Sequence, residues 1–217
     1  MKKGDFLWGA VLVLVIGYIV SPWTNASFIA QTTAHPYISG FIKFAVLSTM
    51  GELLTLRLNK KQWQLPAGFI WRIIIWGFIG ILITLIFQLF ASGVQACMNM
   101  GYLPGGESKL AFAFFTSALM NIFFAPVFMA MHMLSDTYLD LRYGNPMHKP
   151  NYNLVLRNTN WNRYANFIVV KTIPFFWIPA HTITFMMPKA YRIVMAALLS
   201  IALGAILTFA NRQSSKS

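Results

Sequence analysis

The chain has 217 residues, of which 57% are hydrophobic and only 10% are charged, and its mean hydropathy is +0.59. This composition excludes an ordinary soluble domain, in which about 25% of residues are charged, and indicates a membrane protein. The single cysteine, Cys97, excludes an internal disulfide framework and a cysteine-based metal cage. The formal charge of +12 does not indicate nucleic-acid binding, because Lys and Arg cluster between long apolar stretches and form no basic stripe.

Six apolar stretches follow one another along the chain, and most approach the roughly 20 residues that a helix needs to cross a bilayer. We therefore predict an all-α fold with one membrane domain over residues 1–217, built as a bundle of about six transmembrane helices. The lipid bilayer is its first expected partner. The predicted helices lie at about 6–22, 38–58, 68–92, 110–134, 166–187 and 189–210.

The first stretch follows Lys2 and Lys3 and also resembles a signal peptide, with Thr24 and Ala26 as a cleavage site. We expect it to be retained as the first helix, because this is a multispan chain. The N-terminus lacks the Arg- and Ser-rich amphipathic pattern of a mitochondrial presequence.

An even number of spans places both termini on one side, and 12 of the 17 basic residues then lie on that side. Because cytoplasmic loops carry the excess of Lys and Arg, we predict that both termini are cytoplasmic, at the plasma (inner) membrane if the chain is bacterial. The 12 residues are Lys2, Lys3, Arg57, Lys60, Lys61, Arg72, Arg142, Lys149, Arg157, Arg163, Arg212 and Lys216.

The fifth stretch contains Pro174, Pro179 and Pro188. Each proline removes a backbone donor and crowds the carbonyl four residues earlier, so a regular helix cannot pass through undisturbed. The freed carbonyls need partners inside hydrocarbon, which predicts a broken helix ringed by the others. His181 and the threonines after it lie where such partners are needed.

Glu52 is the only acidic residue inside a predicted span. Intramembrane acids generally face a bundle interior or a water-filled path, so Glu52 is a candidate functional residue. The alternative is a structural partner for a cation, for instance Lys171 of the broken helix. Lys43 lies on the opposite side of the same span, and we expect it to extend towards the headgroups. Glu52 shares one face of the second helix with Ala45, Ser48, Thr49, Thr55 and Asn59.

The fourth stretch combines a polar stripe with a kink expected at Pro126. His132, Asp136 and Asp140 have i, i+4, i+8 spacing, which places them along one side of a helix and would suit a metal ion. No second pair of ligands is evident, so we predict no metal site and no cofactor. The stripe consists of Ser117, Asn121, Phe128, His132 and Ser135.

Small residues recur at helical spacing in the third and last stretches, a pattern that lets helix backbones approach closely. We expect these faces to pack and not to transport. They comprise Gly77, Gly80, Thr84, Gln88 and Ala91 in the third stretch, and Ala196, Ser200, Gly204 and Thr208 in the last.

The segment from Trp177 to Arg192 resembles the signature of the peroxisomal and inner-mitochondrial membrane protein family, the family of Mpv-seventeen and the twenty-two-kilodalton peroxisomal membrane protein. The resemblance extends over about residues 35–210 and includes His35-Pro36-Tyr37 and Thr49-Met-Gly-Glu52. It implies a multispan helical protein linked to pore formation and small-metabolite permeation, without assigned catalytic activity. The signature residues, expected to be structural, are Trp177, Pro179, Phe185, Pro188 and Arg192.

The leading function hypothesis is a small-solute pore or transporter, with a small molecule or ion as its solute and further copies of the chain as candidate partners. The alternatives are a structural or partner-binding membrane protein and, more weakly, an intramembrane metal-dependent enzyme using His132, Asp136 and Asp140. No enzyme motif is present, so we expect no catalytic residues. The candidate residues of the path or polar core are Glu52, Ser48, Thr49, Thr55, Asn121, His132, Lys171, His181 and Thr184.

Overall fold

The structure is a computed structural model that describes the backbone of residues 2–144 and 149–214 and the side chains up to residue 206. The described residues form helices and no strand, which confirms the predicted all-α bundle. Five helices are long and apolar enough to span a membrane, and up to six spans result when the bent pair α5–α6 counts as one. These are the helices of a multi-pass membrane protein. The elements are α1 Lys3–Val20, α2 Asn25–Ala34, α3 Pro36–Lys60, α4 Phe69–Asn99, α5 Lys109–Phe123, α6 Ala125–Tyr143, α7 Tyr152–Asn158, α8 Trp161–Arg163, the π-helix η1 Tyr164–Trp177, α9 Ile178–Met186 and α10 Lys189–Ser214.

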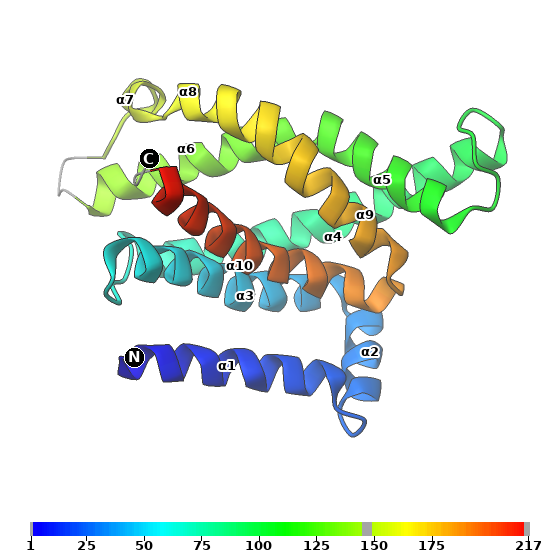
Figure 1. Cartoon of the computed structure of the whole chain (residues 1–217), viewed down its shortest axis with the longest axis horizontal. Helices are drawn as coiled ribbons and strands as arrows, with labels where there is room; N and C mark the ends of the chain where they lie inside the picture. The colour runs from blue at the N-terminus through cyan, green and yellow to red at the C-terminus, as the bar shows by residue number, and fades with distance from the viewer. Residues whose placement is uncertain (1, 145–148, 215–217) are drawn as a thin grey trace.

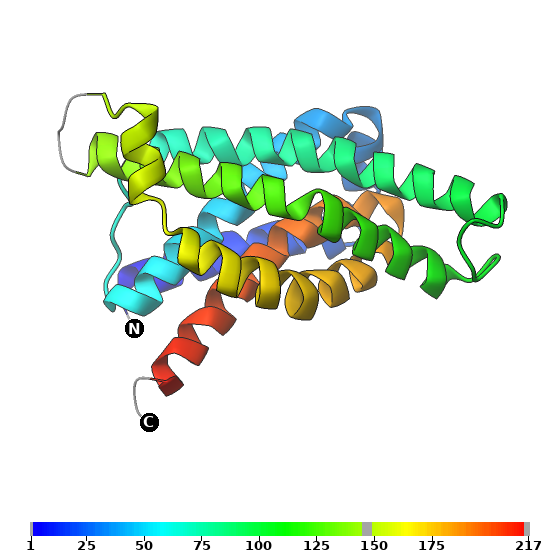
Figure 2. The same cartoon turned by 90° about the horizontal axis from the view of Figure 1, so that it is seen from above.

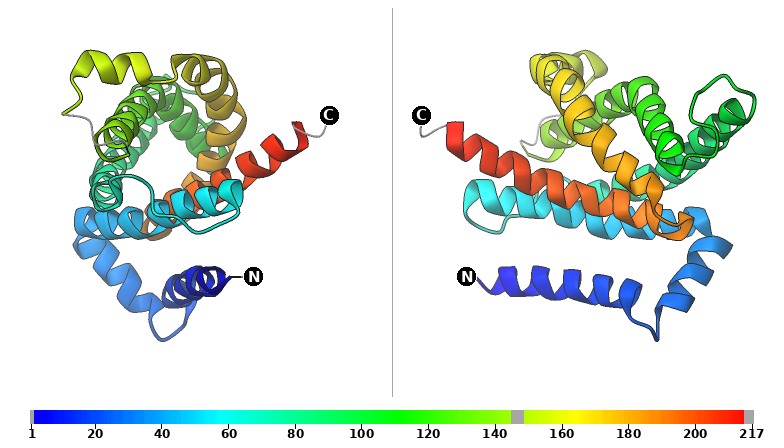
Figure 3. Two further views of the ribbon diagram at one scale, coloured as in Figure 1. Left: turned by 90° about the vertical axis from the view of Figure 1, so that its left-hand side faces the viewer. Right: turned by 45° about the vertical axis from the view of Figure 1, so that its right-hand side comes forward.

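The long helices run side by side, and the start of α1 and the end of α10 lie at the same end of the bundle (Figure 1). Seen along this axis, α3, α4, α5–α6, η1–α9 and α10 surround a common centre, whereas α1 lies apart (Figure 3). Helix α2 runs across the opposite end and joins α1 to α3 (Figure 1). The side of the membrane that each end faces stays a prediction.

Helix α3 packs closely against both α4 and α10 through glycines. A methyl carbon added to Gly80 would lie 2.7 Å from the carbonyl carbon of Gly40, and one added to Gly51 would lie 3.0 Å from the backbone nitrogen of Ile201. Such approaches need small residues, because any side chain would separate the two backbones. The packing role expected for the small residues of the third and last stretches is thus confirmed for Gly80, while the side chain of Thr208 lies outside the described residues.

The broken fifth helix has the form that its prolines predict. Pro174 lies inside the π-helix η1, Pro179 lies in the first turn of α9, and Pro188 lies between α9 and α10. The carbonyl of Ile178, next to Pro179, accepts hydrogen bonds from the hydroxyls of Ser117 (2.7 Å) and Thr182 (2.8 Å). Hydroxyls from α5 and from α9 therefore bond to a backbone carbonyl beside Pro179.

Several predicted boundaries need correction. The segment between the first two spans, expected to be a loop, contains helix α2. Pro36, just after α2, starts α3, since proline fits in the first turn of a helix. The fourth span is two helices that meet at Phe124 with a bend of 49°, and Pro126 lies in the first turn of the second. Helix α6 continues to Tyr143, so the loop expected from Ser135 begins later and carries α7 and α8. Figure 2 shows the α5–α6 pair running beside α4.

Candidate functional site: a central cavity closed by an arginine–carboxylate cluster

Arg72 lies in the first turns of α4 and gathers three acidic side chains from two other helices. Its Nη1 atom lies 2.6 Å from Oε1 of Glu52 on α3 and 2.9 Å from Oδ1 of Asp136 on α6. Its Nη2 atom lies 2.7 Å from Oδ1 of Asp140, one turn further along α6. The Nε atom donates to the carbonyl of Ala67, which fixes the guanidinium plane. We call these four charged side chains the Arg72 cluster.

Exposure changes steeply across the Arg72 cluster. The Arg72 side chain is 6% exposed, and those of Glu52, Asp136 and Asp140 are 20%, 37% and 65% exposed. Three carboxylates against one guanidinium leave an excess of negative charge, which is tolerable because Asp140 is in contact with solvent. The cluster therefore forms a continuous polar connection from the surface to the interior of the bundle.

From the sequence, we expect Arg72 only among the basic residues of the cytoplasmic side. In the structure Arg72 also binds three carboxylates. The expected partner of Glu52 was also wrong: the structure pairs Glu52 with Arg72, whereas Lys171 is exposed. Glu52 meets Arg72 because the two residues lie at the same end of adjacent packed helices, within side-chain contact of each other. A guanidinium can bridge several carboxylates at once, which a lysine does less well.

His132, Asp136 and Asp140 do lie along one side of α6, but the two aspartates face a guanidinium and His132 meets the ring of Trp76. His132 Nε2 lies 3.6 Å from Oδ2 of Asp136, and both aspartates bind Arg72. Across the described ranges, no group of three or more His, Cys, Asp or Glu side chains is arranged to hold a metal ion. The Arg72 guanidinium occupies the position between these carboxylates.

A cavity of about 330 Å³ lies beside the Arg72 cluster and is lined by residues of α3, α4, α5–α6, η1–α9 and α10. We call it the central cavity. Glu52 and Asp136 form part of its wall, so the Arg72 cluster closes one end of it. Apolar residues such as Phe44, Met120 and Leu203 supply most of the remaining surface.

Three polar atoms of residues in the cavity wall are buried without a hydrogen-bond partner among the described residues: Ser48 Oγ, His132 Nδ1 and Trp177 Nε1. A buried donor or acceptor without a partner costs about 1–3 kcal/mol. Native proteins seldom leave such groups unpaired unless water or a ligand meets them. The bundle interior beside the central cavity therefore contains polar atoms that no described group pairs.

A second polar group lies deeper in the wall, where α5 meets α9. The amide of Asn121 donates to the Ser117 carbonyl at 2.9 Å and lies 3.1 Å from Nδ1 of His181. Because an amide nitrogen donates and does not accept, Nδ1 of His181 is the acceptor in this contact. The His181 ring stacks on Trp177 with centroids 5.1 Å apart and meets the edge of Phe87.

The structure brings most of the predicted polar residues together around this cavity. Thr49 and Thr184 are buried elsewhere in the bundle: Thr49 Oγ1 has no hydrogen-bond partner among the described residues, and Thr184 bonds to the Ala180 carbonyl. Lys171 lies on the surface and takes no part. The predicted residues that line the central cavity are Ser48, Glu52, Thr55, Asn121, His132 and His181.

The residues of the Trp177–Arg192 signature hold the turn between α9 and α10. Phe185 is 1% exposed and packs on Phe87, with centroids 4.8 Å apart. The Arg192 guanidinium lies over the Phe185 ring at 5.5 Å and donates to the carbonyl of Met187 at 3.0 Å. Trp177 differs from the others, because it also lines the central cavity.

Comparisons with family models, with curated proteins and with solved structures give no match. The resemblance of the Trp177–Arg192 segment to the peroxisomal and inner-mitochondrial family stays a prediction.

Proposed function

We propose that this protein is a non-enzymatic pore or transporter for small polar solutes, and that the central cavity is part of its path. The observation that carries the proposal is a cavity lined by five helical units and by six of the predicted polar residues, among them the intramembrane acid Glu52.

The Arg72 cluster is the proposed gate. Its carboxylates range from mostly exposed Asp140 to mostly buried Glu52, which also faces the cavity. Opening requires Arg72 to release at least one carboxylate, and a polar solute or water can replace the lost hydrogen bonds. Intramembrane ionisable groups that face a cavity frequently mark such pathways.

The bend between α5 and α6 and the π-helix η1 lie in the same wall, and both are features in which helices change shape at modest cost. They supply the flexible elements that a gated path needs. The resemblance of the Trp177–Arg192 segment points to the same function class. The positive-inside pattern supports cytoplasmic termini, at the plasma (inner) membrane if the chain is bacterial.

The test is solute flux in liposomes that contain the purified full chain. We expect release of small polar solutes above the rate of protein-free liposomes, and we expect Ser48→Leu, which places an apolar side chain in the cavity, to reduce it. Ser92→Leu is the matched control, because Ser92 is exposed on the outer face of α4. Flux equal to that of empty liposomes for every solute tried would instead favour a structural or partner-binding protein.

A further inference from the structure

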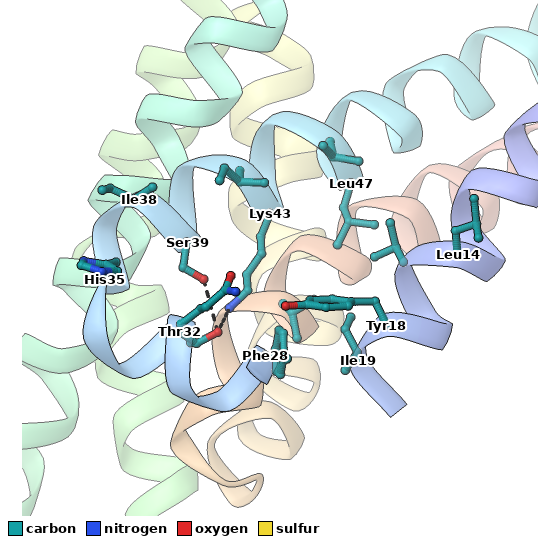
Figure 4. A pocket seen from close by; sticks show the side chains of 15 residues that line it. Leu14, Tyr18, Ile19, Phe28, Thr32, His35, Ile38, Ser39, Lys43 and Leu47 are labelled. Atoms are coloured by element: carbon teal, nitrogen blue, oxygen red, sulfur yellow. Dashed lines mark hydrogen bonds between the residues drawn. The ribbon is translucent and has the colours of Figure 1, made fainter. Parts of the chain in front are cut away.

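A second cavity, distinct from the central one, lies between α1, α2 and α3 (Figure 4). Its volume is about 460 Å³, within the range of about 300–1,000 Å³ that is typical of ligand sites. The wall is mainly aliphatic and aromatic, and Leu14 of α1 and Ile42 of α3 are largely exposed on it. We call it the α1–α3 groove.

The groove exists because α1 packs loosely against the bundle. Ile19 is its one buried residue within the described part of the chain. Near its start, α1 is attached to α3 by the Asp5–Arg57 ion pair and by a hydrogen bond from Trp8 to the Met50 carbonyl. At its other end, α2 holds it away from α3 (Figure 1). Between these attachments, an apolar slot opens towards the lipid phase.

Lys43 stands at the α2 end of the groove. Its side chain leaves α3 and reaches α2, where Nζ lies 2.7 Å from Oγ1 of Thr32, which in turn contacts the Ser39 hydroxyl (Figure 4). The ammonium also lies 4.5 Å from the centroid of the Phe28 ring. None of the ion pairs among the described residues involves Lys43. The Lys43 ammonium is thus held by the Thr32 hydroxyl and the Phe28 ring, without a carboxylate.

Lys43 also belongs to a third cavity, of about 270 Å³, which shares Thr32 with the groove. Two further cations, Lys189 and Arg192, line it together with the polar side chains of Thr84 and Gln88. No acidic residue is among the described residues that line it. We call it the basic pocket. An apolar slot and a positively charged pocket therefore meet at Lys43.

We propose that this pair of cavities binds one anionic phospholipid, with an acyl chain in the α1–α3 groove and the phosphate in the basic pocket against Lys43. The charge complementarity is the main argument, because three basic residues and no acidic residue are among the described residues that line the basic pocket. Lys43 also reaches α2 at the end of the bundle, where the predicted spans place the headgroups. Basic pockets between membrane helices bind anionic lipid headgroups on the cytoplasmic or matrix side. The predicted topology puts this pocket at the end opposite the cytoplasmic termini, so its lipid would belong to the other leaflet.

The experiment compares two lipids with identical acyl chains on the purified full chain, by native mass spectrometry. Phosphatidylglycerol carries the negative charge and phosphatidylcholine does not. We expect wild-type protein to retain one molecule of phosphatidylglycerol in preference to phosphatidylcholine. Lys43→Met should reduce that preference about fivefold, the order expected for one basic residue acting on an anionic lipid. Lys43→Arg should keep it.

Two further variants test the acyl-chain part and protect against a folding defect. Val46→Trp fills the groove from α3 and should reduce retention of both lipids, whereas Val127→Trp places the same side chain on an exposed face of α6 and should not. Lys109→Met removes an exposed cation near the same end of the bundle and should leave the preference unchanged. Far-ultraviolet circular dichroism identifies any variant that does not fold. If Lys43→Met is one of these, the lipid retention of Val46→Trp and Lys43→Arg tests the proposal.

The proposal is overturned if wild-type protein retains the two lipids equally, or if Lys43→Met keeps the full preference. It is also overturned if inorganic phosphate at equal concentration displaces phosphatidylglycerol, or if Val46→Trp retains it as well as wild type. Displacement by phosphate would mean that the basic pocket takes a free anion. Full retention by Val46→Trp would mean that the groove holds no acyl chain.

Discussion

The Nη1 atom of Arg72 lies 2.6 Å from Oε1 of Glu52, and this contact joins α4 to α3 at the mouth of the central cavity. Glu52 is held from a second direction by the indole nitrogen of Trp76, 3.3 Å from Oε2. Because the same guanidinium also binds Asp136 and Asp140, a single side chain couples three helices. The stability of this end of the bundle therefore depends on Arg72 more than on any one carboxylate.

Arg72→Met should destabilise the protein by about 3–5 kcal/mol, because it leaves carboxylates close together without their cation. Asp140→Asn should cost much less, since Asp140 is 65% exposed and water replaces the bond. Thermal unfolding of the purified variants in one detergent measures both. An Arg72→Met protein that melts with wild type would show that the cluster does not hold these helices together.

The coupling between Arg72 and Glu52 is measured by a double-mutant cycle. Glu52→Gln alone and Arg72→Met alone each break the contact, so the double variant should lose less stability than the sum of the two. Chemical unfolding of all four proteins gives the difference. If the two changes in the free energy of unfolding are strictly additive, the Arg72–Glu52 contact contributes no coupling energy.

Much of this arrangement follows from the sequence, and the part that does not has a clear cause. Apolar length predicts the long helices, and Pro174 and Pro179 predict a broken one. The face of α3 with Ser48, Glu52 and Thr55 does line the cavity. The predicted topology already places Glu52, Arg72, Asp136 and Asp140 at one end of the bundle, which was the available signal for the cluster.

What sequence reasoning missed depends on contacts between distant segments. Lys171 was a chemically sensible partner for Glu52, but which cation meets it is set by how α3 packs on α4, and spacing along one helix does not reveal that. Helix α2 was missed because its segment, Asn25–Ala34, is short and weakly apolar, so it shows no span-like pattern. The open α1–α3 groove likewise depends on where α2 holds α1.

Gly80→Ala should separate α3 from α4 and destabilise the protein, because the added methyl carbon would lie 2.7 Å from the carbonyl carbon of Gly40. Gly93→Ala is the matched control on the same helix, since no atom lies within 4 Å of its added carbon. That control should be neutral or stabilising by up to about 1 kcal/mol through helix propensity. Melting temperatures compare the two, and equal effects would contradict the close packing of these backbones.

Asn121→Leu should cost about 1–3 kcal/mol, because it leaves Nδ1 of buried His181 without its donor. Asn99→Leu, on the exposed end of α4, should have little effect. Unfolding monitored by tryptophan fluorescence is suitable, since Trp177 stacks on His181. If the two variants unfold alike, the Asn121–His181 contact contributes nothing to stability.

The most direct test of the central claim is access to the cavity from water during transport. The chain has one cysteine, so Cys97→Ser gives a background in which Ser48→Cys places a thiol in the cavity wall and Ser92→Cys places one on the outer face. A small charged thiol reagent should label Cys at 48 and reduce solute flux in liposomes, and it should leave flux through the Ser92→Cys protein unchanged. Undiminished flux after complete labelling at 48, or flux in a protein whose position 48 cannot be labelled at all, would contradict a path through the central cavity.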